Sequence, residues 1–306
     1  MQSPDQARMR ALVSLLSDEN ARVVAEARRA LRDHGAKALP HLELAIEEGD
    51  AKLRARARLA RDEVRIHLLE RELRELGERL DRDESALEDG CILIARTRDP
   101  DLDPATIRAA LDAMADDLGS RLGTSDHPLT VLNVMTRLLA RELGFHGNQR
   151  NYYDPDNSYL HKVLERRIGI PISLCVIYLF VARRLSIPLV GVGMPGHFIL
   201  RHTRSDPTLF VDPFGGGRIL SEADCMRYLE SEGEGNYDPT WLLPMSDGAI
   251  LLRMIRNLLL IYRNRGETHR QEILQRLKGV LVGEEVPGRK SDDAQPGAER
   301  GAAGDR

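Results

Sequence analysis

Residues 144–202 read GFHGNQRNYYDPDNSYLHKVLERRIGIPISLCVIYLFVARRLSIPLVGVGMPGHFILRH, and residues 209–220 read LFVDPFGGGRIL. The run after Pro171 is apolar nearly all round as far as Arg183. Proline is tolerated in the first turn of a helix, so we predict a buried helix that begins at Pro171. LVGVGMPG then alternates like a strand, and HFILRH and LFVDPF predict two further short strands joined by a hairpin-like connection over residues 203–208.

This hairpin permits a geometric prediction for His197 and Asp212. If its turn centres near residues 204–206, the numbers of facing residues sum to about 409–411, which puts Asp212 opposite His197 or on its diagonal. The two side chains then share one face of the sheet with Cβ atoms roughly 4.5–8 Å apart, and the carboxylate can orient the imidazole. A register shifted by one residue would place them on opposite faces, and His197 would be a strand residue satisfied by backbone groups.

Five elements of the segment occur in an order that resembles the transglutaminase-like superfamily, specifically its bacterial SirB-type branch, whose domain also appears in an F-box protein. They are Gly147–Ser158, Leu164-Glu165-Arg166-Arg167, Gly169-Ile170-Pro171-Ile172, Pro195-Gly196-His197-Phe198 and Asp212-Pro213-Phe214. The resemblance covers the region from Leu132 to Leu220. It implies a mostly helical α+β protein with a cysteine-protease-like core, in which a buried helix packs on a small antiparallel sheet.

The resemblance also implies a set of catalytic residues. The family's order is a cysteine at a helix N-terminus, where thiolate is favoured, then a histidine and an aspartate on adjacent strands. Here Pro171 occupies the position of the family cysteine, and proline has no nucleophile. The substitute is Cys175, with His197 as base and Asp212 as orienting group. The apolar neighbours of Cys175 favour a buried thiol with a raised pKa instead.

Other polar residues of the segment have two interpretations each. Ser173 can cap the helix or act as a nucleophile, and we favour the cap. The asparagines of Gly147–Ser158 suit turns, because their side chains bond nearby backbone. They can also line a polar ligand cleft, for which the candidates are Asn148, Tyr153 and Asn157. Residues 215–217 lack the spacing of a phosphate-binding loop, so we expect no nucleotide site.

Helical periodicity dominates the chain before this segment. Residues 6–80 predict helical pairs that resemble HEAT-type repeats, with an ordinary helical bundle as the alternative. Within them, Asp62–Leu80 is so highly charged that we expect a solvated or bridging helix, or a coiled coil. The pair Asp103-Pro104 predicts the N-cap and first position of a helix that ends at Leu122, and Leu132–Leu143 predicts another.

After the segment, residues 250–281 predict a helical hairpin with its turn at Arg265-Gly266-Glu267, which resembles a shortened tetratricopeptide-like tail. A single hairpin must pack on the domain or on a partner. The expected division is therefore a HEAT-like region (1–80), a transglutaminase-like domain (81–245, core 132–220), the tetratricopeptide-like hairpin (246–282) and a disordered tail (283–306).

Composition narrows the class of protein. The 306 residues include 44 Lys and Arg against 48 Asp and Glu, a net charge of −4, which does not suggest nucleic-acid binding. Cys91, Cys175 and Cys225 are far apart, so we expect neither disulfides nor a metal site, and we expect Cys91 and Cys225 to be structural. We find no secretory signal or membrane-length apolar run, and we expect a cytoplasmic protein without a cofactor.

Two functional hypotheses follow. The leading one is a non-catalytic transglutaminase-like binding or scaffold protein that contacts a protein partner through its helical repeats. The alternative is a cysteine-dependent hydrolase or amide-acyl transferase that uses Cys175, His197 and Asp212. Proline at the helix start favours the first hypothesis. The sequence does not fix the oligomeric state.

Overall fold

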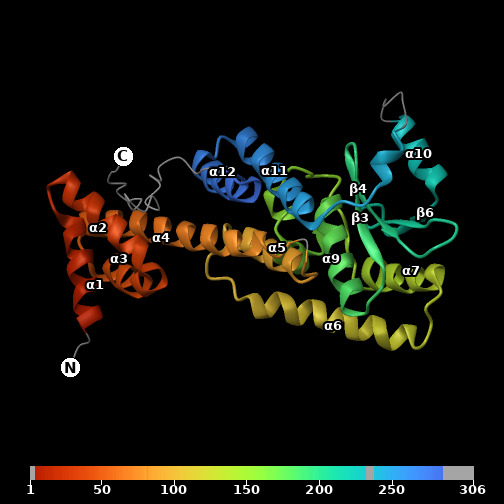
Figure 1. Ribbon diagram of the computed structural model, residues 1–306, viewed down its shortest axis with the longest axis horizontal. Helices are drawn as coiled ribbons and strands as arrows, with labels where there is room; N and C mark the ends of the chain where they lie inside the picture. Colours follow the sequence, from red (N-terminus) through yellow and green to blue (C-terminus); the bar gives the residue numbers. More distant parts are fainter. Residues whose placement is uncertain (1–3, 81, 232–237, 285–306) are drawn as a thin grey trace, which may run out of the picture.

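The computed structural model describes residues 4–80, 82–231 and 238–284 (Figure 1). It is a mostly helical α+β fold with a small antiparallel sheet, as predicted. The helices are α1 Pro4–Ser14, α2 Ala21–His34, α3 Leu39–Glu48, α4 Ala51–Gly77, α5 Ala86–Arg96, α6 Pro104–Leu122, α7 Pro128–Thr136, α8 Leu160–Arg166, α9 Pro171–Arg184, α10 Glu222–Ser231, α11 Asp247–Arg265 and α12 Thr268–Val282. The strands are β1 His146–Gly147, β2 Ile168–Gly169, β3 Leu189–Met194, β4 His197–His202, β5 Phe210–Asp212 and β6 Arg218–Leu220.

Helices α1 to α3 gather around the first half of α4 at one end of the molecule (Figure 1). Their shared core includes Leu16, Leu31 and Leu42, all fully buried. Side-chain oxygens cap two of the helices: Asn20 accepts from the amide of Arg22, and Asp50 accepts from that of Leu53. The prediction of helices in this region is confirmed for the residues that the structure describes.

Helix α4 extends over 27 residues and ends at Gly77, so the charged helix predicted at Asp62–Leu80 is the second half of one longer helix and stops three residues earlier than predicted. Leu69, Leu73 and Leu76 in that half are buried in the main core of the molecule. Helix α12 packs along it, with Arg276 Nε 2.6 Å from Glu70 Oε1. The solvated interpretation is therefore wrong for this face, and the bridging interpretation is confirmed.

Two of the helices that precede the sheet, α6 and α7, begin at prolines. Helix α6 begins at Pro104, and the Asp103 carboxylate accepts from the Ala105 amide, as predicted. Helix α7 begins at Pro128 rather than at Leu132, because proline fits the first turn and extends the helix toward the N-terminus. Its continuation over Arg137–Glu142 widens to i→i+5 hydrogen bonding.

Helix α9 is the buried helix at the centre of the domain. It begins at Pro171, and its residues are buried from Pro171 to Ala182. Its long apolar surface packs on β3 and β4 and against α6. The antiparallel sheet has the order β3-β4-β5-β6. The core predicted from the sequence, a buried helix on a small antiparallel sheet, is confirmed.

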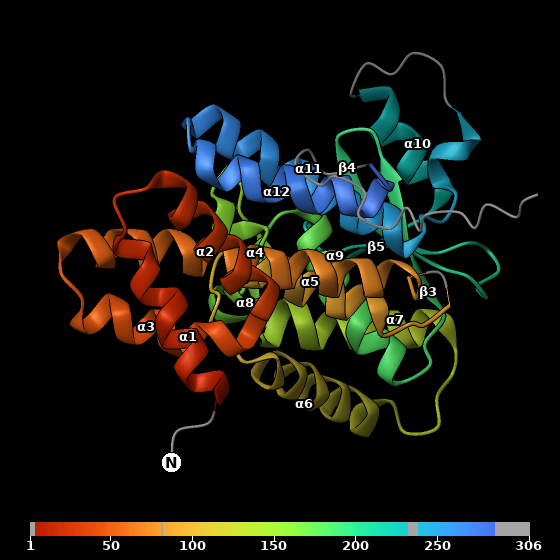
Figure 2. The ribbon, with the colours of Figure 1, turned by 60° about the vertical axis from the view of Figure 1, so that its left-hand side comes forward.

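The C-terminal helices α11 and α12 turn at Gly266, whose φ of 69° is a left-handed conformation that suits glycine. In Figure 2 this hairpin lies along α4 and α5, and α11 also contacts α9. The main core runs from Leu69 to Leu277, so it crosses both expected boundaries, at 80/81 and at 245/246. Most of the tail predicted to be disordered, residues 285–306, lies outside the described residues.

Over the part of the chain that the structure describes, no helix combines the length and the apolar character that a membrane crossing requires.

Candidate functional site

His197 begins β4 and Asp212 ends β5, on neighbouring antiparallel strands. Because Leu200 faces Val211 and Arg201 faces Phe210, Asp212 lies on the diagonal of His197, on the same face of the sheet. Their side chains meet, with His197 Nε2 3.1 Å from Asp212 Oδ1. The geometric prediction for this His–Asp pair, the dyad, is confirmed.

The Asp212 carboxylate is almost entirely buried, with 5% of its side chain exposed. Burial raises the pKa of Asp212, but the hydrogen bond and charge of His197, the Gly215 amide and the Arg218 guanidinium outweigh burial, and the pKa is lowered overall. Gly215 donates its amide to Oδ1 at 3.0 Å. An ionised carboxylate can only accept, so Nε2 of His197 carries the proton and Nδ1 is the atom that remains for a ligand.

Aromatic rings and one arginine position the imidazole. The His197 ring lies 6.0 Å from the Phe214 ring in an edge arrangement, and 5.3 Å from the Tyr228 ring. Arg253 on α11 donates to the backbone carbonyl oxygens of His197 and Met194. Sequence reasoning missed Arg253, because nothing local to residue 253 indicates that α11 returns to the β3–β4 turn.

A cavity of about 560 Å³ opens beside the dyad, and we name it the dyad cavity. Pro171 at the start of α9, His197 and Asp212 all line it, together with Phe214 and Tyr228. The prediction that the dyad faces the first turn of the helix is therefore confirmed. The side chain at that helix start is the pyrrolidine ring of Pro171, which offers no nucleophilic atom.

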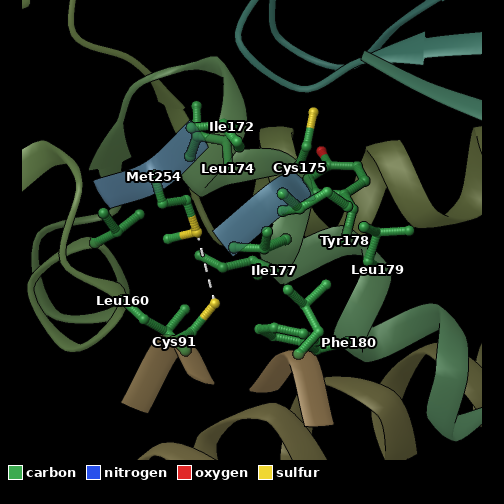
Figure 3. Close-up of a cluster of buried hydrophobic side chains, with 14 of the residues drawn as sticks. Cys91, Leu160, Ile172, Leu174, Cys175, Ile177, Tyr178, Leu179, Phe180 and Met254 are labelled. Atoms are coloured by element: carbon green, nitrogen blue, oxygen red, sulfur yellow. Dashed lines mark hydrogen bonds between the residues drawn. The ribbon is translucent and has the colours of Figure 1, made fainter. Parts of the chain in front are cut away.

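Cys175 is fully buried on α9, among the apolar side chains shown in Figure 3, as predicted. Its Sγ donates a hydrogen bond to the carbonyl oxygen of Phe198 at 3.4 Å, and not to the imidazole of His197. Burial, with the charge of Asp212 as a second cause, raises the pKa of the thiol well above its usual value. Cys175 does not line the dyad cavity.

The other two cysteines are also free and buried. Cys91 lies beside Met254 between α5 and α11 (Figure 3). Cys225 on α10 borders the dyad cavity, a position that sequence reasoning did not foresee. Burial raises the pKa of Cys225 to about 12, so its thiol is protonated at neutral pH.

Ser173 and Asn157 have structural roles. The Ser173 hydroxyl donates to the Asn157 carbonyl oxygen at 2.6 Å and accepts from the Ile170 amide at 3.0 Å, which confirms the predicted cap. The Asn157 amide is fully buried and donates to the backbone oxygen of Asn151 at 2.7 Å. The turn interpretation of the asparagine-rich loop therefore holds for Asn157, which is not a cleft residue.

The two remaining cleft candidates, Asn148 and Tyr153, lie in different surroundings. Tyr153 has 58% of its surface exposed and lines neither of the two described cavities, so its role as a cleft residue stays a prediction. Asn148 lines a second cavity of about 820 Å³, which we name the basic cavity. Arg150 and Arg218 line it too, and neither was predicted. Their position depends on β1 pairing with β2 and on the turn between β5 and β6, which no local pattern reveals.

The basic cavity adjoins the dyad cavity. Gln149, Phe214, Gly215 and Arg218 line both. No group of three or more His, Cys, Asp or Glu side chains within the described residues has the arrangement of a metal site. The arrangement can bind a polar ligand at the dyad and a charged group beside it.

Comparison with known proteins gives the class of domain and then the family. Residues 105–256 match the transglutaminase-like superfamily model, and the helix-and-sheet core with its His–Asp dyad lies within that range. A UPF0162 protein of Pseudomonas aeruginosa is 34% identical over 188 residues, which cover 60% of this chain and 67% of that protein. The chain belongs to the UPF0162 family.

Two other relatives show how far the similarity extends. A UPF0162 protein of Xylella fastidiosa (strain Temecula1) is 42% identical over 179 residues, 56% of this chain and 63% of that protein. The match thus spans slightly less than two thirds of the length of that relative. F-box only protein 21 of Homo sapiens is 33% identical over 153 residues, 47% of this chain and 24% of that protein. No solved structure shows significant similarity to the chain.

Proposed function

We propose that this chain is a non-catalytic transglutaminase-like protein of the SirB type that binds a protein partner. One observation carries the proposal: Pro171, at the start of α9, stands where the dyad faces the helix. A helix N-terminus beside a histidine is where a cysteine would be held as a thiolate. Proline removes the nucleophile from that position and leaves the base and its orienting carboxylate in place.

The three thiols support the same proposal. All are fully buried, and burial raises the pKa of each. A nucleophilic cysteine needs the opposite environment, partly exposed and electropositive. Free, unpaired cysteines also suit a reducing compartment, so we place the protein in the cytoplasm as part of this proposal.

The helical flanks supply a surface for a partner. We interpret α1 to α4 as HEAT-like pairs and α11–α12 as a tetratricopeptide-like hairpin, and such helices use one face for packing and the other for binding. Leu44 on α3 and Leu59 on α4 have 45% and 56% of their surface exposed. We propose that the partner contacts these helices through the two leucines.

A cysteine-dependent hydrolase or acyl transferase is the second candidate, favoured by the 3.1 Å contact of the dyad. It requires the Cys175 thiol to leave its hydrogen bond with Phe198 and reach the imidazole. That movement would unpack the buried surface of α9, which holds the centre of the main core.

Thiol alkylation separates the two candidates. We expect a fluorescent iodoacetamide to leave all three cysteines of the native wild-type protein unlabelled at neutral pH. Pro171 is buried in the fold but lines the dyad cavity at the start of a helix and beside His197, unlike Cys91 and Cys175. The variant Pro171→Cys should therefore be labelled at residue 171, at least about tenfold faster than an ordinary exposed thiol, because the helix start and His197 stabilise its thiolate. Pro171→Cys combined with His197→Ala should lose most of that rate advantage.

The controls are Pro171→Ala, which should stay unlabelled, and Cys175→Ala. Labelling of wild-type Cys175 that disappears in His197→Ala would overturn the proposal in favour of the hydrolase. An unreactive Pro171→Cys would show that the helix start does not hold the family's nucleophile position.

A further inference from the structure

The basic cavity gathers positive charge in a chain whose net charge is −4. Arg150 comes from the asparagine-rich loop, Arg218 from β6 and His146 from β1. No Asp or Glu is among the described residues that line this cavity. The two arginines supply this charge: Arg218 has the Asp212 carboxylate 3.6 Å away, while Arg150 has no counter-charge among the described residues. A bound anion would supply one.

The two arginines of the basic cavity have hydrogen-bond donors that are available to a ligand. Arg150 is exposed and has no hydrogen-bond or ion-pair partner among the described residues. Arg218 Nη2 is 3.6 Å from Asp212 Oδ2, longer than a hydrogen bond, and 69% of its side chain is exposed. His146 Nδ1 donates to the Gly144 carbonyl oxygen at 2.8 Å, so Nε2 of the neutral imidazole is an acceptor, and the two arginines are the donors available to an anion.

The shape of the site limits the ligand. A guanidinium binds a carboxylate or phosphate through two parallel hydrogen bonds. The basic cavity, at about 820 Å³, is larger than one such group needs, and it continues into the dyad cavity past Phe214 and Gly215. The dyad cavity is lined by the apolar side chains of Met194 and Leu220 and also by Asp212 and Asp224. A peptide whose acidic side chain lies in the basic cavity and whose backbone amide reaches the dyad cavity matches both cavities.

We infer that the two cavities together bind an acidic peptide segment of a partner protein. A side-chain carboxylate of the peptide lies between Arg150 and Arg218, and the adjoining residue enters the dyad cavity, where His197 Nδ1 can accept a hydrogen bond from its amide. The inference rests on the proposed function, since a peptide that is held and not cleaved requires the absence of a nucleophile at Pro171.

Fluorescence anisotropy with a labelled oligoglutamate peptide tests the inference on the full chain. The peptide should bind the wild type, and an oligoglutamine peptide of the same length should not. Arg150→Ala and Arg218→Ala should each weaken oligoglutamate binding by about tenfold, the effect of losing one charge-assisted hydrogen-bonded pair. Arg150→Glu should abolish binding, and about 0.3 M salt should weaken it in the wild type.

The matched control is Arg263→Ala, an exposed arginine on α11 outside both cavities, which should bind like the wild type. Equal binding by Arg150→Ala, Arg218→Ala and Arg263→Ala, or no binding of oligoglutamate at all, would overturn the inference. Binding of inorganic phosphate to the two arginines without binding of oligoglutamate would replace the peptide by a small anion. None of these outcomes changes the alkylation result at residue 171, so the two proposals fail separately.

Discussion

Arg253 Nη2 lies 2.7 Å from the backbone oxygen of His197 and 3.1 Å from that of Met194. These two carbonyls bracket the turn between β3 and β4, so one side chain of α11 fixes the strand end that carries the imidazole. The guanidinium also lies over the Phe198 ring, 5.5 Å from its centre. The C-terminal hairpin is therefore a structural part of the candidate site.

Arg253→Ala should destabilise the fold by about 2–3 kcal/mol, because two carbonyl oxygens lose a charged donor in a half-buried place. Urea denaturation gives that free energy, and the imidazole NMR signals of His197 should shift. The control is Arg256→Ala on the exposed face of the same helix, which should change stability by at most about 0.5 kcal/mol. Equal effects of the two variants would mean that Arg253 does not position the dyad.

Asp212→Asn should change how stability depends on pH. The pKa of the folded Asp212 lies below the ordinary value of 3.8, so its ionised form stabilises the fold. That contribution is fully present above the unfolded-state pKa and disappears as pH falls through the folded-state pKa. The gap in unfolding free energy between wild type and Asp212→Asn should therefore shrink as the pH falls below about 4. A gap unchanged throughout the acid range would contradict the lowered pKa.

Gly215→Ala should break the contact between the side chains of His197 and Asp212. A Cβ at residue 215 would stand 2.5 Å from Asp212 Oδ2 and 3.0 Å from Arg218 Nε, so the carboxylate must move. We expect a loss of about 1–3 kcal/mol in stability, as for other overpacked sites, with a shifted His197 imidazole signal. Gly77→Ala is the control, because no atom lies within 4 Å of its Cβ position. It should leave the imidazole signal unchanged, and an identical spectrum for Gly215→Ala would rule out the clash.

Glu70→Gln should weaken the contact between α4 and α12. The Glu70 side chain is 7% exposed and its Oε1 is 2.6 Å from Arg276 Nε, so the pair is well shielded from water on one side. We expect a loss of about 1.5–3 kcal/mol, the range for hydrogen bonds to charged groups. Glu75→Gln on the same helix removes an exposed partner of Arg71 and should cost less than about 1 kcal/mol. Thermal unfolding compares the two, and equal costs would show that the buried pair adds nothing.

Local sequence features predicted what local physics determines. Pro171 and the Asp103-Pro104 pair place helix starts, because proline fixes φ and an aspartate side chain satisfies a free amide. The dyad was also predictable, since a short hairpin connection fixes the strand register within a residue or two. Both predictions depend only on residues close in sequence or joined by one turn.

Contacts between distant segments were not predictable in the same way. Arg253 reaches His197 across 56 positions in the chain, and Arg150 meets Arg218 at a cavity formed by separate loops. Asn157 has the chemistry of a ligand-binding residue, but its own loop uses that amide. For α4, the sequence did contain a signal of burial, because Leu69, Leu73 and Leu76 have helical spacing. The charged residues around these leucines obscured that signal.

Leu68 and Leu69 are neighbours in sequence, yet the first belongs to the core of the N-terminal helices and the second to the main core. The uninterrupted helix α4 therefore lines both cores. A chain cut between residues 80 and 81 would leave Leu69, Leu73 and Leu76 exposed to water on one fragment and their partners uncovered on the other. We therefore expect the two cores to unfold together, although the sequence of the N-terminal half is repeat-like.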